Sequence, residues 1–146
     1  DTRRIAGPAE NIMVSPGAGS TGGLQTSTLA VGLSHAAIRF LKKQVGERPE
    51  LSENARALDG QFENLVQQLL NAADGHPTCS REHLRTESNS LVLRATQSAL
   101  VAAKGAGYVE GHPVGRWCRE ALFFLVWSCP QGVAQANLCE LAGLEN

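Results

Sequence analysis

Three side chains of the kind that bind metal ions lie close together in the sequence: His76, Cys79 and His83. A structural zinc site needs four nitrogen or sulfur ligands, which usually come from closely spaced pairs. The fourth ligand would have to be His112 or Cys118, and the expected helix of about 25 residues in between is roughly 37 Å long. Because this helix separates the groups, we predict a polar loop with no bound metal. A zinc-stabilised domain stays a less favoured alternative.

A glycine-rich stretch, Gly17–Gly22, matches the formal pattern G-x-G-x-x-G. In a dinucleotide-binding fold this turn follows a β-strand, opens a helix and belongs to a βαβ unit. Here the short apolar stretch Ile12–Val14 and Pro16 precede it, and no second strand is expected after the next helix. A nucleotide-binding module is therefore also a less favoured interpretation.

The sequence offers no nucleophile, base and orienting group at a spacing that favours catalysis. Ser34 and His35 are adjacent, and neighbours at i and i+1 do not face each other on a helix. Paired carboxylates such as Glu50 and Glu53 lie on a polar helix face. We therefore predict that the domain is not an enzyme and carries no cofactor.

Aromatic residues follow a charged helical segment in the C-terminal third of the chain. We expect Arg116, Arg119 and Glu120 to face water, and Phe123 and Trp127 continue this line at i, i+4 spacing. Either the next helix or the N-terminal stretch covers the two aromatic rings, or they stand exposed and anchor a partner segment. The candidate partner-binding residues are therefore Phe123, Trp127, Arg116 and Arg119.

Charge and composition exclude several classes of protein. The chain of 146 residues has 13 Lys and Arg against 14 Asp and Glu, a net charge of −1. This balance is unlike a basic nucleic-acid-binding surface, so we predict no nucleic-acid partner. The apolar run Ala121–Trp127 is much shorter than the ~18 residues of a membrane span, so we predict none. The cationic residues on two expected helices should be solvated: Arg39, Lys42, Lys43, Arg81, Arg85 and Arg94.

Apolar residues at helical spacing mark five segments, at about 24–45, 51–73, 80–104, 113–129 and 131–143. Short polar, Gly and Pro connections separate them. The clearest stripe is spaced by three or four residues throughout: Leu51, Ala55, Leu58, Phe62, Leu65, Leu69 and Ala73. Alternation with period two is not sustained, which disfavours strands.

These segments predict an all-α fold, an antiparallel bundle of four to five helices with a flexible N-terminal segment. Residues 1–23, which contain Pro8, Pro16 and five glycines, form that segment or linker, and residues 24–146 form the bundle domain. The architecture resembles the four- and five-helix bundles of cytoskeletal adaptors. This resemblance lies in the Ala-rich third helix, the long heptad-like second helix and the short loops, and no functional residue follows from it.

The chain has four cysteines, Cys79, Cys118, Cys129 and Cys139. Three of them lie in apolar helical patterns typical of buried free thiols, and we predict a reducing compartment, cytoplasmic or nuclear. The chain starts without Met and without a signal-peptide pattern, so we expect a fragment or processed product of a larger intracellular protein. The favoured function is a non-enzymatic adaptor or scaffold domain that binds a short amphipathic segment or a helical partner in a groove between helices. The alternative is an obligate assembly subunit, whose apolar surface is covered by self-association or by a larger partner.

Overall fold

The structure is a computed structural model, and it describes residues 24–144. This part of the chain forms five α-helices and two short 3-10 helices and contains no strand, which confirms the predicted all-α bundle. The predicted N-terminal segment, residues 1–23, lies outside the described residues. The elements are α1 (Leu24–Gln44), η1 (Pro49–Leu51), α2 (Ser52–Ala73), α3 (Arg81–Ala103), η2 (Lys104–Tyr108), α4 (Pro113–Val126) and α5 (Gln131–Leu141).

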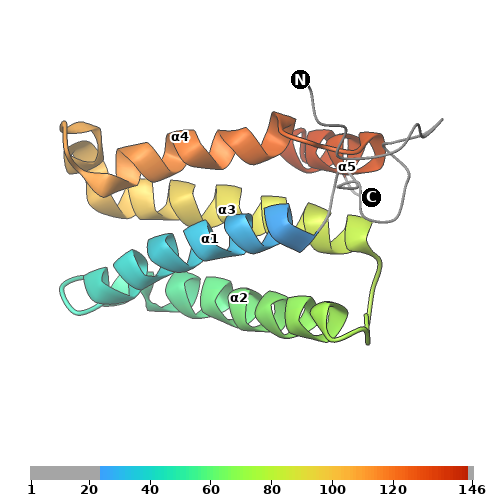
Figure 1. Ribbon diagram of the computed structural model, residues 1–146. Helices are drawn as coiled ribbons and strands as arrows, with labels where there is room; N and C mark the ends of the chain where they lie inside the picture. Colours follow the sequence, from blue (N-terminus) through green and yellow to red (C-terminus); the bar gives the residue numbers. More distant parts are fainter. Residues whose placement is uncertain (1–23, 145–146) are drawn as a thin grey trace, which may run out of the picture.

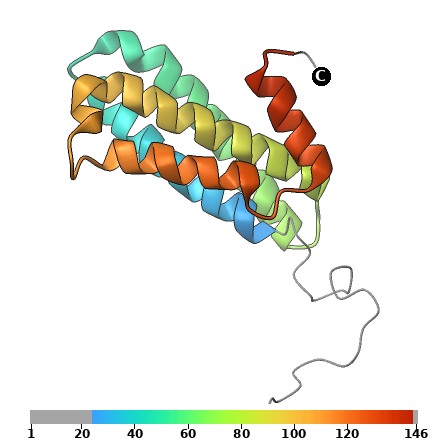
Figure 2. The same ribbon diagram turned by 90° about the horizontal axis from the view of Figure 1, so that it is seen from above.

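Helices α1 to α4 lie side by side, and consecutive helices run antiparallel (Figure 1). Helix α3 packs against all four other α-helices, most extensively against α1. Helix α5 turns back beside the first half of α3 and diverges from α4 (Figure 2). The bundle is therefore organised around α3, with α5 as an additional cover over its N-terminal half.

The environment of α3 explains why its sequence lacks a clear polar face. The six consecutive residues from Ser88 to Leu93 are all buried, so more than a full turn of the helix is enclosed on every side. Two of its buried hydroxyl groups bond inside the helix: Ser88 Oγ donates to the Leu84 carbonyl oxygen at 2.6 Å, and Thr96 Oγ1 to that of Val92 at 2.8 Å. Ser90 Oγ donates to Glu140 Oε1 of α5 at 2.6 Å. Serine and threonine can therefore occupy buried positions of α3 without leaving a hydroxyl donor unpaired.

The start of α4 packs closely on η2 through two glycines. A Cβ atom at Gly115 would lie 2.5 Å from the carbonyl oxygen of Gly107, closer than packed atoms allow. Gly107 is itself buried against Leu100 and Ala103. This contact fixes the position of the first turn of α4, and with it the direction of the whole helix.

Replacing Gly115 with alanine is expected to lower the free energy of unfolding by about 1–3 kcal/mol, because the added methyl group would overpack this contact. Gly60→Ala is the matched control, since a Cβ atom at Gly60 in α2 meets nothing within 4 Å. That change should raise stability by about 0.5–1 kcal/mol through helix propensity. Urea denaturation followed by circular dichroism measures both variants. Equal stabilisation by the two changes would contradict the close packing of η2 on α4.

Candidate binding site

Helix α4 positions the four residues predicted to bind a partner. It begins at Pro113, and the Nδ1 atom of His112 caps it by accepting the backbone N–H of Val114 at 3.4 Å. Arg116 is exposed and forms an ion pair with Glu120, with 3.3 Å between Nε and Oε1. Arg119 is exposed as well. The polar half of α4 therefore faces water along its outer side.

Four large apolar side chains stand exposed in the last turn of α4. The exposed fractions are 55% for Leu122, 42% for Phe123, 79% for Val126 and 57% for Trp127. The rings of Phe123 and Trp127 stack, with 5.3 Å between centroids and 20° between planes. Helix α5 leaves both rings exposed, and the N-terminal stretch that was the other expected cover lies outside the described residues.

Two buried side chains of α3 hold the end of α4. Arg85 Nη2 donates to the carbonyl oxygens of Trp127 at 2.9 Å and Phe124 at 3.3 Å. Asn89 Nδ2 donates to the Phe124 oxygen at 3.0 Å. The last carbonyls of a helix lack partners within the helix and carry partial negative charge, so a cation is favourable there. The backbone that carries Phe123 and Trp127 is thus tied directly to the central helix.

Arg85 was predicted to be solvated, and that prediction is wrong. The side chain is fully buried, because α4 and α5 enclose the first half of α3. Burial lowers the pKa of Arg85, while the neighbouring Cys129 raises it. Its Nε and Nη1 atoms have no hydrogen-bond partner among the described residues. Sequence reasoning missed this residue because an arginine flanked by Glu82 and Glu87 has the pattern of a solvated helix face.

The prediction for α4 was also too long at its C-terminal end. The expected helix continued to about residue 129, but α4 ends at Val126, and Ser128 has a positive φ of 45°. Glycine is the usual residue at such a left-handed helix end, and none occurs here. The turn therefore had no signal in the sequence.

A hollow at the contact between α1 and α4, lined by Phe40 and Trp117 among others, marks one end of a surface that follows the outer side of the two helices and is called the groove below. Two stripes with spacing 4, 3, 4, 3 border it, one on each helix: Leu29, Leu33, Ala36, Phe40 and Lys43 on α1, and Pro113, Trp117, Glu120, Phe124 and Trp127 on α4. Phe40 meets Trp117 edge to face, with 6.2 Å between ring centroids. Nearer the other end, Leu33 packs against the cluster that contains Phe124. The groove thus leads from the Phe40–Trp117 contact to the exposed rings at the end of α4.

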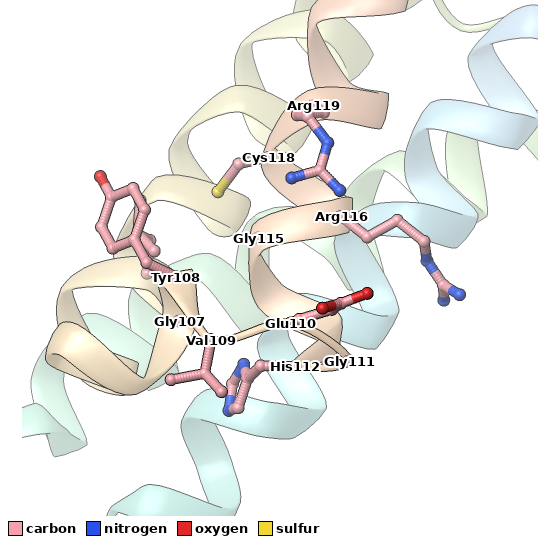
Figure 3. A pocket seen from close by; sticks show the side chains of 11 residues that line it. Gly107, Tyr108, Val109, Glu110, Gly111, His112, Gly115, Arg116, Cys118 and Arg119 are labelled. Atoms are coloured by element: carbon pink, nitrogen blue, oxygen red, sulfur yellow. The ribbon is translucent and has the colours of Figure 1, made fainter.

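A second hollow lies where η2 meets α4, with a volume of about 520 Å³ (Figure 3). Its wall includes Arg119 and the first turns of α4, while the side chain of Arg116 points away from Cys118. Two of the groups in this wall that could do chemistry, His112 and Cys118, have structural hydrogen bonds. His112 caps α4, and Cys118 Sγ donates to the Thr96 carbonyl oxygen at 3.3 Å.

The less favoured sites of the sequence analysis gain no support. In residues 24–144, no three His, Cys, Asp or Glu side chains are grouped so that they could hold a metal ion. Cys79, between His76 and His83, donates instead to Gln68 Oε1 at 3.4 Å. The glycine motif at Gly17–Gly22 lies outside the described residues.

No described helix is both long and apolar enough to cross a bilayer. All four cysteines are free thiols, and each is half-buried, so the prediction of buried thiols is wrong. Comparison with models of protein families, with curated proteins and with solved structures finds no match.

Two thiols, Cys118 within α4 and Cys129 just after it, should make the free energy of unfolding depend on pH in the alkaline range. Burial raises the pKa of Cys118 and that of Cys129. The hydrogen bond to Thr96 and the charge of Arg119 lower the pKa of Cys118 less strongly, and the charge of Arg85 does the same for Cys129. Below the ordinary thiol pKa of about 8.5, both thiols stay protonated in the folded and unfolded states. Above it the unfolded chain loses its protons first, so the free energy of unfolding falls as pH rises through the folded pKa values.

The double variant Cys118→Ala, Cys129→Ala should therefore show a weaker fall in stability above about pH 8.5 than the unmodified chain. Denaturation midpoints measured at several alkaline pH values test this. The control variant Cys79→Ala, Cys139→Ala removes the same number of thiols and should keep the fall. If stability falls equally in the two variants, Cys118 and Cys129 do not cause the fall.

Proposed function

We propose that this bundle is a non-enzymatic protein–protein interaction domain, an adaptor or scaffold module of a larger intracellular protein. It binds an amphipathic helix of its partner in the outer groove between α1 and α4. The observation that carries the proposal is the exposed, stacked pair Phe123 and Trp127 at one end of this groove.

The composition of this end of the groove supports a docking role. Trp and other aromatic residues dominate the energetics of protein interfaces, because they bury large areas with few rotatable bonds. Leu122 and Val126 extend the apolar surface beside the two rings. Contiguous exposed apolar surface of this kind is typical of an interaction site.

The rigidity of the anchor adds to this argument. Arg85 and Asn89 bind the backbone at Phe124 and Trp127, so the two rings stand on a turn that is already fixed. A fixed anchor loses less conformational entropy when the partner binds than a mobile one would.

The form of the groove favours a helical partner. The two bordering stripes repeat every seven residues and run antiparallel, as they do where a third helix packs into a helix pair. From Pro113 to Trp127 the groove is roughly 21 Å long, the length of about 14 helical residues. A partner helix with apolar residues at i, i+3, i+4 and i+7 fits this surface.

The four free thiols support a reducing compartment, cytoplasmic or nuclear, for the domain. The proposal includes neither a cofactor nor a nucleic acid, since the groove offers apolar surface with few charges.

The double variant Phe123→Ala, Trp127→Ala is expected to weaken partner binding by about 30-fold or more, since each anchor ring contributes on the order of 1–2 kcal/mol. The partner is first captured from a cell lysate, its bound segment is mapped by cross-linking, and the affinity of that segment as an isolated peptide is measured by calorimetry. The helical content and unfolding midpoint of the variant should change little, because both rings are exposed.

Leu138→Ala, Leu141→Ala is the matched control, because it removes two exposed apolar side chains from α5, away from the groove. It should leave the affinity within about twofold. Unfolding of the Phe123, Trp127 variant would assign these rings to the core, and equal affinity of both variants would refute the proposed anchor.

The exposed side of α5 favours a second function, an assembly subunit. Leu138, Leu141 and Leu144 are exposed at a spacing of three residues. If this side joins two copies, light scattering of the whole chain will give a mass near twice 15.5 kDa, and Leu138→Ala, Leu141→Ala will return it to the monomer value. A monomer at all concentrations rejects self-assembly and leaves the groove proposal standing.

A further inference from the structure

The end of the groove opposite the Phe123–Trp127 pair contains a hollow of about 310 Å³. Its apolar wall is formed by Ala36 and Phe40 on α1 and by Pro113 and Trp117 on α4. Phe40 is half-buried and also meets the ring of His112 edge to face at 5.9 Å, so the aromatic wall is fixed from two sides. An apolar side chain of a bound segment fits into this hollow, against the exposed sides of the two rings.

The charged residues that line this hollow are both positive. Arg39 and Lys43 complete the lining, and no acidic side chain of the described residues contributes to it. The three ion pairs of the described chain join other groups: Lys42–Asp59, Arg94–Glu140 and Arg116–Glu120. Arg39 and Lys43 are therefore exposed cations without a described carboxylate partner, beside an apolar hollow.

The stability of α1 explains the presence of one of these two cations, Lys43. Lys43 lies in the last turn of α1, where a positive charge stabilises the C-terminal end of a helix. Arg39 lies a full turn earlier, and like charges at i and i+4 repel each other by a few tenths of a kcal/mol on a helix. A carboxylate supplied from outside would interact favourably with both.

The N-terminal part of this chain fits this end of the groove poorly. Residues 1–23 carry Asp1 and Glu10 against Arg3 and Arg4, so they offer no net negative charge. A segment of a separate, acidic partner matches the charge of the hollow better.

We infer that the α1–α4 groove selects an acidic amphipathic helix of a partner protein, whose carboxylates face Arg39 and Lys43. This inference rests on the proposed function of the groove and specifies its partner. One apolar anchor enters the hollow beside Phe40 and Trp117, and a second meets the Phe123–Trp127 pair. The two anchors are about seven or eight residues apart in the partner, two helical turns, because their sites on α4 are separated by that distance.

A peptide-display selection on the whole chain tests the inference. The probe is a library of helix-forming peptides of about 16 residues, with leucine or aromatic residues at the stripe positions and Glu, Gln and Lys encoded equally elsewhere. The library is selected on the unmodified chain, on Arg39→Gln, Lys43→Gln and on the control Arg56→Gln, Arg81→Gln. The control removes the same charge from exposed positions that do not line the hollow.

Peptides enriched on the unmodified chain and on the control are expected to have a negative mean charge, and those enriched on Arg39→Gln, Lys43→Gln to lose this preference. The best acidic peptide should bind that variant about 3- to 10-fold more weakly, with a difference that shrinks at high salt. Enrichment without a charge preference, with a basic preference, or with the same preference on both variants overturns the inference.

The variant Phe123→Ala, Trp127→Ala separates this inference from the proposed function. If peptides of any charge bind the unmodified chain and lose affinity for this variant, the groove binds helices but does not select acidic ones. If no peptide is enriched on the unmodified chain, the acidic selectivity is rejected, and the proposed function is then judged by the captured partner alone. Binding to a second copy of the chain in place of the peptide would also reject it.

Discussion

The enclosure of α3 is the constraint on which the rest of the structure depends. A helix that four others contact must bury side chains in every direction, and α3 does so with small residues and with hydroxyl groups that bond to its own backbone. Close packing around such a helix fixes the positions of its neighbours, because protein interiors tolerate few voids. The angle at which α4 and α5 lie on α3 follows from this packing.

Arg85 connects this buried centre with the surface. Burying a cation is unfavourable unless acceptors compensate for the lost water, and here the acceptors are the terminal carbonyls of α4. Those carbonyls in turn need donors, because the helix ends and cannot supply them. The two requirements meet at Nη2 of Arg85, while its Nε and Nη1 have no hydrogen-bond partner among the described residues. The same interaction fixes the position of the turn that carries Trp127.

The sequence predicts the elements well and their mutual arrangement poorly. The regular stripe from Leu51 to Ala73 predicts a helix that matches α2 to within one residue, because this helix has a single buried side. The sequence of α3 shows only a weak helical periodicity, because its enclosed middle part has no exposed polar face opposite a buried apolar one. Phe40 and Trp117 could be located only once the pairing of α1 with α4 was known, since their contact joins residues far apart in the chain. Spacing within one helix carries no information on which other helix faces it.

The apolar last turn of α4 is not explained by the stability of the bundle. Ala121 and Phe124 fill the core at this level, and Arg85 closes the helix end, so the fold has no evident use for Val126 or Trp127 on the outer side. Polar residues in place of Val126 and Trp127 would be better solvated, whereas Phe123 also meets the core residue Phe124 edge to face. The Arg116–Glu120 pair one turn earlier shows that the same side of α4 accommodates charge. Large exposed apolar groups are typical of a surface that a partner covers, which is the physical basis for proposing a partner-binding role for this end of the groove.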